Sequence, residues 1–122
     1  MAIARDIMGG GTPAGQAKAI NGRVAATVSA AGTTLSDATQ LDSTTNYLST
    51  VAASTGVKLF NGEIGDTMTV YNGGANPVVV YPHSSTGTIN QLSAGTGHTL
   101  ATSTRADYTR VTSTKWIVSL SA

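Results

Sequence analysis

Residues Gly56 to Pro82 read GVKLFNGEIGDTMTVYNGGANPVVVYP. Short runs of β-branched and aromatic residues alternate here with glycine-rich segments that are typical of turns. Asn-Gly follows two of these runs, at Asn61 and Asn72, and a further Asn-Gly stands at Asn21. Asn-Gly is a strong hairpin signal, because both central positions of a type I′ turn require positive φ. The stretch therefore predicts short antiparallel strands joined by tight turns.

The same pattern continues on both sides of this stretch. From Arg23 onward, strand-like runs alternate with turn signals every 8–12 residues, which is typical of a β-sandwich or barrel. Residues 35–48 are the one alternative helix, and their many Ser and Thr residues argue against it. The sequence predicts an all-β fold, an antiparallel β-sandwich with jelly-roll topology, over residues 23–122, preceded by an extended N-terminal arm over residues 1–22.

Alternation of apolar residues within the strands predicts the core. Residues two apart in a strand point to the same face, so each alternating apolar set is expected to face inward. Trp116 belongs to such a set, which favours a core position over an exposed stacking platform. The predicted core consists of Met68, Val70, Val78, Val80, Trp116, Val118 and Leu120.

The N-terminal segment differs from the rest of the chain. It has a Gly triplet, a Pro and no sustained period of 2 or 3.6, so it cannot bury enough apolar area to fold alone. It nevertheless carries large apolar residues that a discarded tail would not need. We expect it to be an assembly arm that uses Ile3, Arg5, Ile7, Met8 and Ile20.

Composition limits the classes of function. The chain has 122 residues, a net charge of +1, 11% charged residues and no cysteine. Nucleic-acid binding normally needs a clustered basic face, and a membrane span needs about 18 continuous apolar residues, so neither partner is expected. No signal-peptide pattern is present at the start, and synthesis in a cytoplasm is expected. A neutral surface rich in small residues suits close protein contact, because such residues lose little on desolvation.

No catalytic or metal-binding pattern emerges from the sequence. His83 and His98 are the only histidines, and neither stands in a nucleophile–base arrangement. Glu63 and Asp66 form a weak calcium-like pair, and we interpret Asp66 as a turn residue. The Gly10 loop lacks the Lys and Ser/Thr of a phosphate loop. We expect no enzymatic activity, no cofactor and no metal; a small hydrolase using His83 or His98 is the minor alternative.

Residues Gly56 to Ala122 resemble a known protein family. The stretches GVKLFNGEIGDTMTVYNGGANPVVVYP, GTINQLSAGTGHTLATS and KWIVSLSA are similar to runs in small virion structural proteins of tailed bacteriophages, some of which are head decoration (cement) proteins. The resemblance implies a jelly-roll or related β-sandwich fold and a homotrimer.

The hypothesis that follows is a capsid decoration protein. It would bind the major capsid protein on the outer shell of the virion and bridge neighbouring capsomers, after synthesis in the host cytoplasm. Closed symmetry would multiply weak contacts into avidity. The alternative is a tail, fibre or head-fibre module that binds host-surface carbohydrate. Tyr71, Tyr81 and Trp116 fall within predicted strands, whereas sugar-binding aromatics usually lie in loops.

Overall fold

The computed structural model describes residues 23–120, and this part of the chain forms strands and no helix. The strands are β1 (Val24–Ser29), β2 (Thr39–Gln40), β3 (Thr45–Thr50), β4 (Gly56–Lys58), β5 (Thr67–Asn72), β6 (Val78–Tyr81), β7 (Thr88–Ile89), β8 (His98–Leu100), β9 (Arg105–Arg110) and β10 (Lys115–Leu120). The all-β class is thus confirmed. No helix within residues 23–120 is long and apolar enough to cross a membrane.

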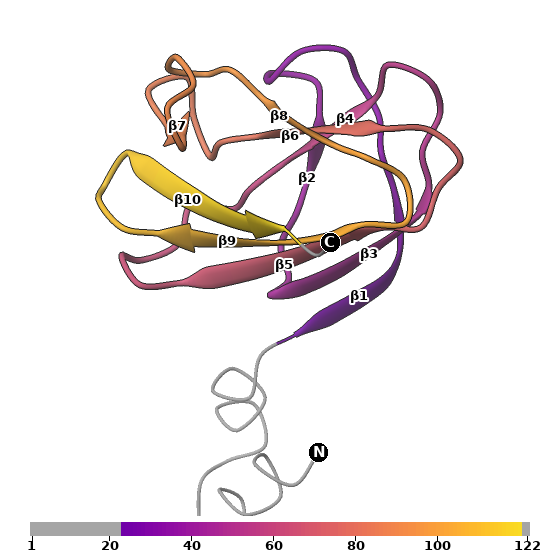
Figure 1. Ribbon diagram of the computed structural model, residues 1–122, viewed down its shortest axis with the longest axis horizontal. Helices are drawn as coiled ribbons and strands as arrows, with labels where there is room; N and C mark the ends of the chain where they lie inside the picture. The colour runs from indigo at the N-terminus through magenta and orange to yellow at the C-terminus, as the bar shows by residue number, and fades with distance from the viewer. Residues whose placement is uncertain (1–22, 121–122) are drawn as a thin grey trace, which may run out of the picture.

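The strands form two facing sheets. Sheet A has six strands in the order β1-β3-β5-β9-β10-β7, and sheet B has four in the order β2-β4-β6-β8. From β1 to β8 the chain alternates between the sheets, so that each odd-numbered strand lies in sheet A and each even-numbered strand in sheet B. In Figure 1 strands β1, β3, β5, β9 and β10 of sheet A lie below β4, β6 and β8 of sheet B. Each pair of consecutive strands therefore makes one coil.

The coils stack on one another as a β-solenoid of about four turns. Five of the eight strand pairings are parallel, among them β1 with β3, β3 with β5, β2 with β4 and β4 with β6. The predicted antiparallel jelly-roll sandwich is therefore wrong. Neighbouring strands in a jelly roll are antiparallel. Here the partner of a strand follows one coil later in the same sheet and runs parallel to it.

The last part of the chain departs from this winding. The hairpin of β9 and β10 inserts into sheet A between β5 and β7, with β9 antiparallel to both β5 and β10. Strand β7 then pairs in parallel with the start of β10, and β8 pairs antiparallel with β6. The C-terminal hairpin thereby completes the core of the last coils.

The Asn-Gly pairs do not form the predicted hairpin turns. In the described range positive φ among residues other than glycine occurs at Ser54, Asn90 and Ser103, so Asn61 and Asn72 lack the type I′ conformation. Asn72 instead uses its side chain, whose Nδ2 donates to Leu100 O at 3.1 Å and whose Oδ1 accepts from Gly74 N at 3.0 Å. These hydrogen bonds fix a corner between coils. Asn21 lies outside the described residues.

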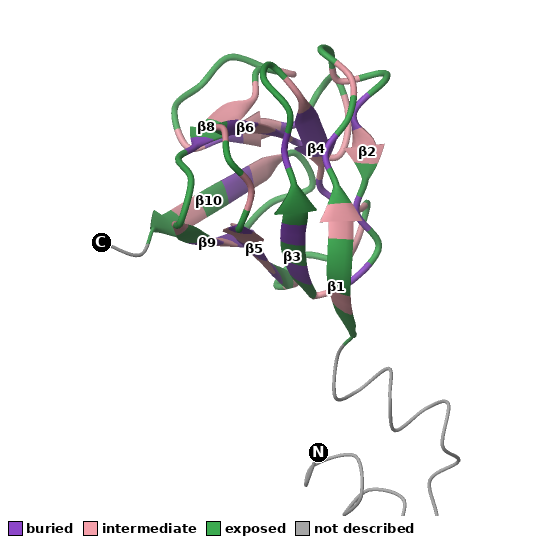
Figure 2. Cartoon of the chain, turned by 90° about the vertical axis from the view of Figure 1, so that its right-hand side faces the viewer, coloured by how far each residue is buried: buried purple, intermediate pink, exposed green. Residues whose placement is uncertain are grey.

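The core lies between the two sheets, and Figure 2 shows buried residues alternating with exposed ones along β3. Of the predicted core residues, Met68, Val70, Val78, Val80 and Trp116 are fully buried, and Val118 is partly buried against them. Leu120, which was expected in the core, is 55% exposed. It pairs with Ala106 at the end of β10, beyond the two residues of β10 that pair with β7.

Candidate functional site

The outer face of sheet A is an ordered array of polar side chains. It consists of the residues that alternate with the buried ones on β3, β5, β9 and β10, namely Thr45, Tyr47, Ser49, Thr67, Thr69, Tyr71, Arg105, Asp107, Thr109, Lys115, Ile117 and Ser119. Strand register places them in rows across the sheet. One row joins Thr45, Thr69 and Asp107, and the next joins Tyr47, Tyr71 and Arg105.

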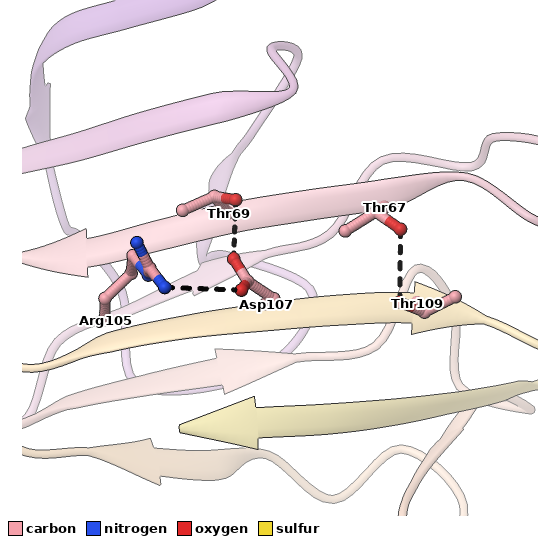
Figure 3. A network of polar contacts seen from close by, with 5 residues as sticks. All are labelled: Thr67, Thr69, Arg105, Asp107 and Thr109. Atoms are coloured by element: carbon pink, nitrogen blue, oxygen red, sulfur yellow. Dashed lines mark hydrogen bonds and ion pairs between the residues drawn. The ribbon is translucent and has the colours of Figure 1, made fainter. Parts of the chain in front are cut away.

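Side-chain hydrogen bonds link neighbouring strands on this face (Figure 3). Thr69 Oγ1 donates to Asp107 Oδ1 at 2.7 Å, and the hydroxyl oxygens of Thr67 and Thr109 lie 3.1 Å apart. Arg105 Nη2 lies 3.8 Å from Asp107 Oδ2. Arg105 and Asp107 carry opposite charges that cancel, and Lys115 at the start of β10 is the third charged residue of the array. The face therefore has a formal net charge of only +1, and its hydroxyl groups are partly preordered by bonds within the protein.

Two tyrosines form the aromatic part of the outer face. The rings of Tyr47 and Tyr71 stack with centroids 5.3 Å apart and an angle of 15° between their planes. Tyr47 is 43% exposed. Its ring lies directly over Gly73, where an added Cβ would come within 2.5 Å of the phenol oxygen. The glycine thus leaves room for an aromatic pair to lie flat along the sheet.

A second polar cluster is buried, and it centres on Arg110. This arginine occupies an inward-facing position of β9 opposite Trp116, and it is only 7% exposed. Its guanidinium donates to oxygens of two separate segments, the β4–β5 loop and the β9–β10 turn, and so joins both to the end of β9. The acceptors are Asn61 Oδ1 at 2.8 Å, Gly62 O, Thr112 O at 3.4 Å and Ser113 O at 2.5 Å.

The charge of Arg110 is balanced by oxygen dipoles. Within residues 23–120 the single ion pair is that of Arg105 with Asp107, so no described carboxylate neutralises Arg110. Four acceptor oxygens take its place. A buried charge is tolerated only when its hydrogen bonds are satisfied, and this cluster fulfils that condition by drawing loops together.

The two histidines have different surroundings. His83 Nδ1 accepts from Trp116 Nε1 at 3.0 Å, and its Nε2 lies 3.3 Å from Arg110 Nη2. Burial, and then the charge of Arg110, lower the pKa of His83. His98 lies on β8, and its Nδ1 is 3.1 Å from the Tyr108 hydroxyl on β9, so this contact links the two sheets. Burial lowers the pKa of His98 and raises that of Tyr108 well above its usual range.

The remaining candidate residues from the sequence either form a turn or lie outside the described part of the chain. Asp66 Oδ2 accepts from Glu63 N at 2.7 Å, and Asp66 N donates to Glu63 O at 3.0 Å, which confirms Asp66 as a turn residue. No group of three or more potential metal ligands comes together in residues 23–120. Ile3, Arg5, Ile7, Met8, Ile20 and the Gly10 loop all lie outside the described residues.

Sequence reasoning missed both the tyrosine pair and Arg110. The tyrosines stand on strands that are neighbours only in the solenoid, so no hairpin register would pair them. Arg110 did carry a signal, because it continues the inward alternation of Ala106 and Tyr108. Comparisons with protein-family models, with curated proteins and with solved structures each found no match for this chain.

Proposed function

We propose that this chain is a non-catalytic structural protein of a tailed-phage particle, which decorates the capsid shell through the outer face of sheet A. The outer face is the observation that carries the proposal. It is a hydroxyl-rich surface of low net charge on a continuous sheet. Such a surface loses little on desolvation when it meets another protein.

Two further features support a role in assembly. The resemblance of residues Gly56 to Ala122 to phage virion proteins gives the class of particle. The low charge of the whole chain, 11% of residues, suits repeated close contact with many equivalent sites. In this proposal the partners are the major capsid protein and two further copies in a homotrimer, at the capsid surface, and residues 1–22 act as the anchoring arm.

Charge substitutions on the two sheets would test the attachment face. Thr45 on β3 and Thr99 on β8 are both exposed, but they lie on sheet A and sheet B respectively. Thr45→Lys should weaken co-sedimentation with isolated capsid shells, because the contact would then bury a strongly hydrated ammonium. Thr99→Lys should bind like the unaltered protein. Equal binding by both variants would exclude the outer face of sheet A.

The arm and the location on the particle need separate measurements. Removal of residues 1–22 should weaken shell binding or trimer formation, measured by co-sedimentation and native mass. Cryo-electron microscopy of the virion should show the protein over the capsid surface. Density at the tail or one vertex alone would exclude decoration of the shell.

A carbohydrate-binding fibre module is the second candidate, and the tyrosine pair favours it. Aromatic side chains with nearby polar groups are common in ligand sites, and Tyr71 lies in register with Arg105. Tyr47→Ala should then abolish binding on a glycan array. Tyr81→Phe is the matched control, because the Tyr81 hydroxyl donates to Thr33 O away from this face. A glycan signal that survives Tyr47→Ala would exclude this site.

A further inference from the structure

His83 lies between two groups that can only donate hydrogen bonds. It follows β6 and starts the connection to β7, and its ring is half-buried. The indole Nε1 of Trp116 is 3.0 Å from its Nδ1, and Nη2 of Arg110 is 3.3 Å from its Nε2. Neither an indole N–H nor a guanidinium can accept a proton or a hydrogen bond.

This arrangement constrains the protonation state of the ring. A neutral imidazole offers one acceptor nitrogen, and Trp116 uses it at Nδ1 because that contact is the shorter one. Arg110 Nη2 donates to Ser113 O instead. A protonated imidazole offers no acceptor at all. Protonation would therefore break the hydrogen bond from Trp116 and set two cations 3.3 Å apart.

No ion pair within residues 23–120 offsets this cost. Arg110 contributes the charge from β9, and Trp116 on β10 is uncharged. The neighbouring β4–β5 loop contributes the neutral Asn61 and Gly62 to the cluster. The same loop carries two carboxylates, Glu63 and Asp66, and that of Asp66 accepts from Glu63 N at 2.7 Å. Within residues 23–120 no carboxylate forms an ion pair with His83. The positively charged ring thus has no favourable place in the closed structure.

We propose that His83 is an acid-released latch, whose protonated ring leaves its position between Trp116 and Arg110 and loosens the β6–β7 connection. We expect the β6–β7 connection to be the segment that moves, because few contacts hold it. Its hydrogen bonds are local: Gly87 N donates to Ser84 O at 3.0 Å, the hydroxyls of Ser84 and Thr86 lie 3.0 Å apart, and Gly87 O accepts from Gly95 N of the next connection at 2.8 Å. The β6–β7 connection also leads into a strand of only two residues at the edge of sheet A. This inference is independent of the proposed function.

The direction of the pH response follows from linkage. In the open form the ring is solvated and has the ordinary histidine pKa of 6.5, whereas burial and Arg110 lower the pKa in the closed form. The ratio of open to closed molecules should therefore rise as pH falls below 6.5, by up to about tenfold per pH unit, until the closed-form pKa is reached.

Trp116 provides the measurement, because it is the only tryptophan of the chain. Its emission spectrum should change reversibly between pH 7.5 and 5.0, with a midpoint below 6.5. Carboxyl groups with ordinary pKa values near 4 remain ionised over this range. His83→Gln supplies an uncharged acceptor and should remove the transition. His98→Gln is the matched control and should keep it.

Two results would overturn the latch. One is an emission spectrum that stays constant over this range, and the other is a transition that persists in His83→Gln. If His83→Gln does not fold, NMR of the unaltered protein replaces it. The Trp116 indole N–H signal and the His83 ring signals must then titrate with one midpoint, and different midpoints would contradict the proposal.

Discussion

At the scale of single residues, Arg110 connects segments that are far apart in the sequence, because its side chain donates hydrogen bonds to four oxygens in two loops. Its guanidinium holds the β4–β5 loop and the β9–β10 turn against the end of β9. Buried carbonyl oxygens that lose their donors cost about 1–3 kcal/mol each. A change at this position therefore affects several loops at once.

Replacement of Arg110 should be strongly destabilising. We expect Arg110→Ala to lower the free energy of unfolding by about 3 kcal/mol, because buried acceptors would lose their donors. Arg105 lies on the same strand, and its side chain is 58% exposed. Arg105→Ala should cost less than about 1 kcal/mol, since exposed ion pairs contribute little. Urea denaturation of both variants measures the difference, and similar losses would contradict the role assigned to Arg110.

Adjacent residues of β10 should differ in the same way. Trp116 is fully buried, whereas Ile117 is 46% exposed on the outer face. Trp116→Ala should cost about 3–5 kcal/mol through loss of packing. Ile117→Ala should cost below about 1 kcal/mol. Chemical denaturation should separate the two variants clearly, and an equally large loss for Ile117→Ala would show that the outer face is covered.

At this scale the sequence was informative about burial. Alternation identified five fully buried residues. A strand with one buried face shows apolar residues at every second position, and this pattern does not depend on which strands lie beside it. It failed for Leu120, which is 55% exposed at the end of β10, because alternation does not show where the cover over a strand ends. It also gave no warning that Asn61 would serve as an acceptor for Arg110, because that contact joins residues 49 positions apart.

At the scale of elements, hydroxyl ladders connect β5 with β9. The bond from Thr69 to Asp107 is partly buried, whereas the contact between Thr67 and Thr109 is exposed. A partly buried carboxylate gains more from its donor than an exposed hydroxyl, which water can satisfy instead.

Two isosteric substitutions on β5 test this difference. Thr69→Val should lower the free energy of unfolding by about 1 kcal/mol, because Asp107 loses a hydrogen bond of 2.7 Å. Thr67→Val should stay within about 0.5 kcal/mol of the unaltered protein. Thermal and urea unfolding provide the values. A larger loss for Thr67→Val would reverse the assignment.

The elements also show why the predicted topology failed. Strand positions were largely correct, since residues 67–71 and 116–120 fall within β5 and β10. Turn signals every few residues mark where a strand ends, but they do not say whether the chain then turns back or crosses to another sheet. The corner at Asn72 illustrates this. Asn72 does not adopt positive φ as a hairpin turn would require, and its side chain instead accepts a hydrogen bond from Gly74 N.

At the scale of the whole molecule, stability should depend on pH through both histidines. The folded-state pKa values of His83 and His98 lie below 6.5. The unfolded chain then binds more protons than the folded one below pH 6.5, and this difference favours unfolding. Stability is therefore complete above about pH 6.5 and decreases as the pH falls below it.

The denaturation midpoint in urea should accordingly be lower at pH 5.5 than at pH 7.5. The double variant His83→Gln with His98→Gln should show a smaller difference between the two pH values. Constant ionic strength controls for changes in screening of surface charges. A midpoint that is unchanged or higher at pH 5.5 would contradict the lowered pKa values.

The stacking of coils also determines which insertions the molecule can accept. Partners on neighbouring coils are 21 residues apart for Val24 and Thr45, and 24 apart for Thr45 and Thr69. An in-frame duplication of one such repeat would lengthen the stack and leave every later strand in its own sheet. A duplication of half a repeat would shift each later strand to the opposite sheet. Growth of this gene by tandem duplication is thus restricted to whole coils.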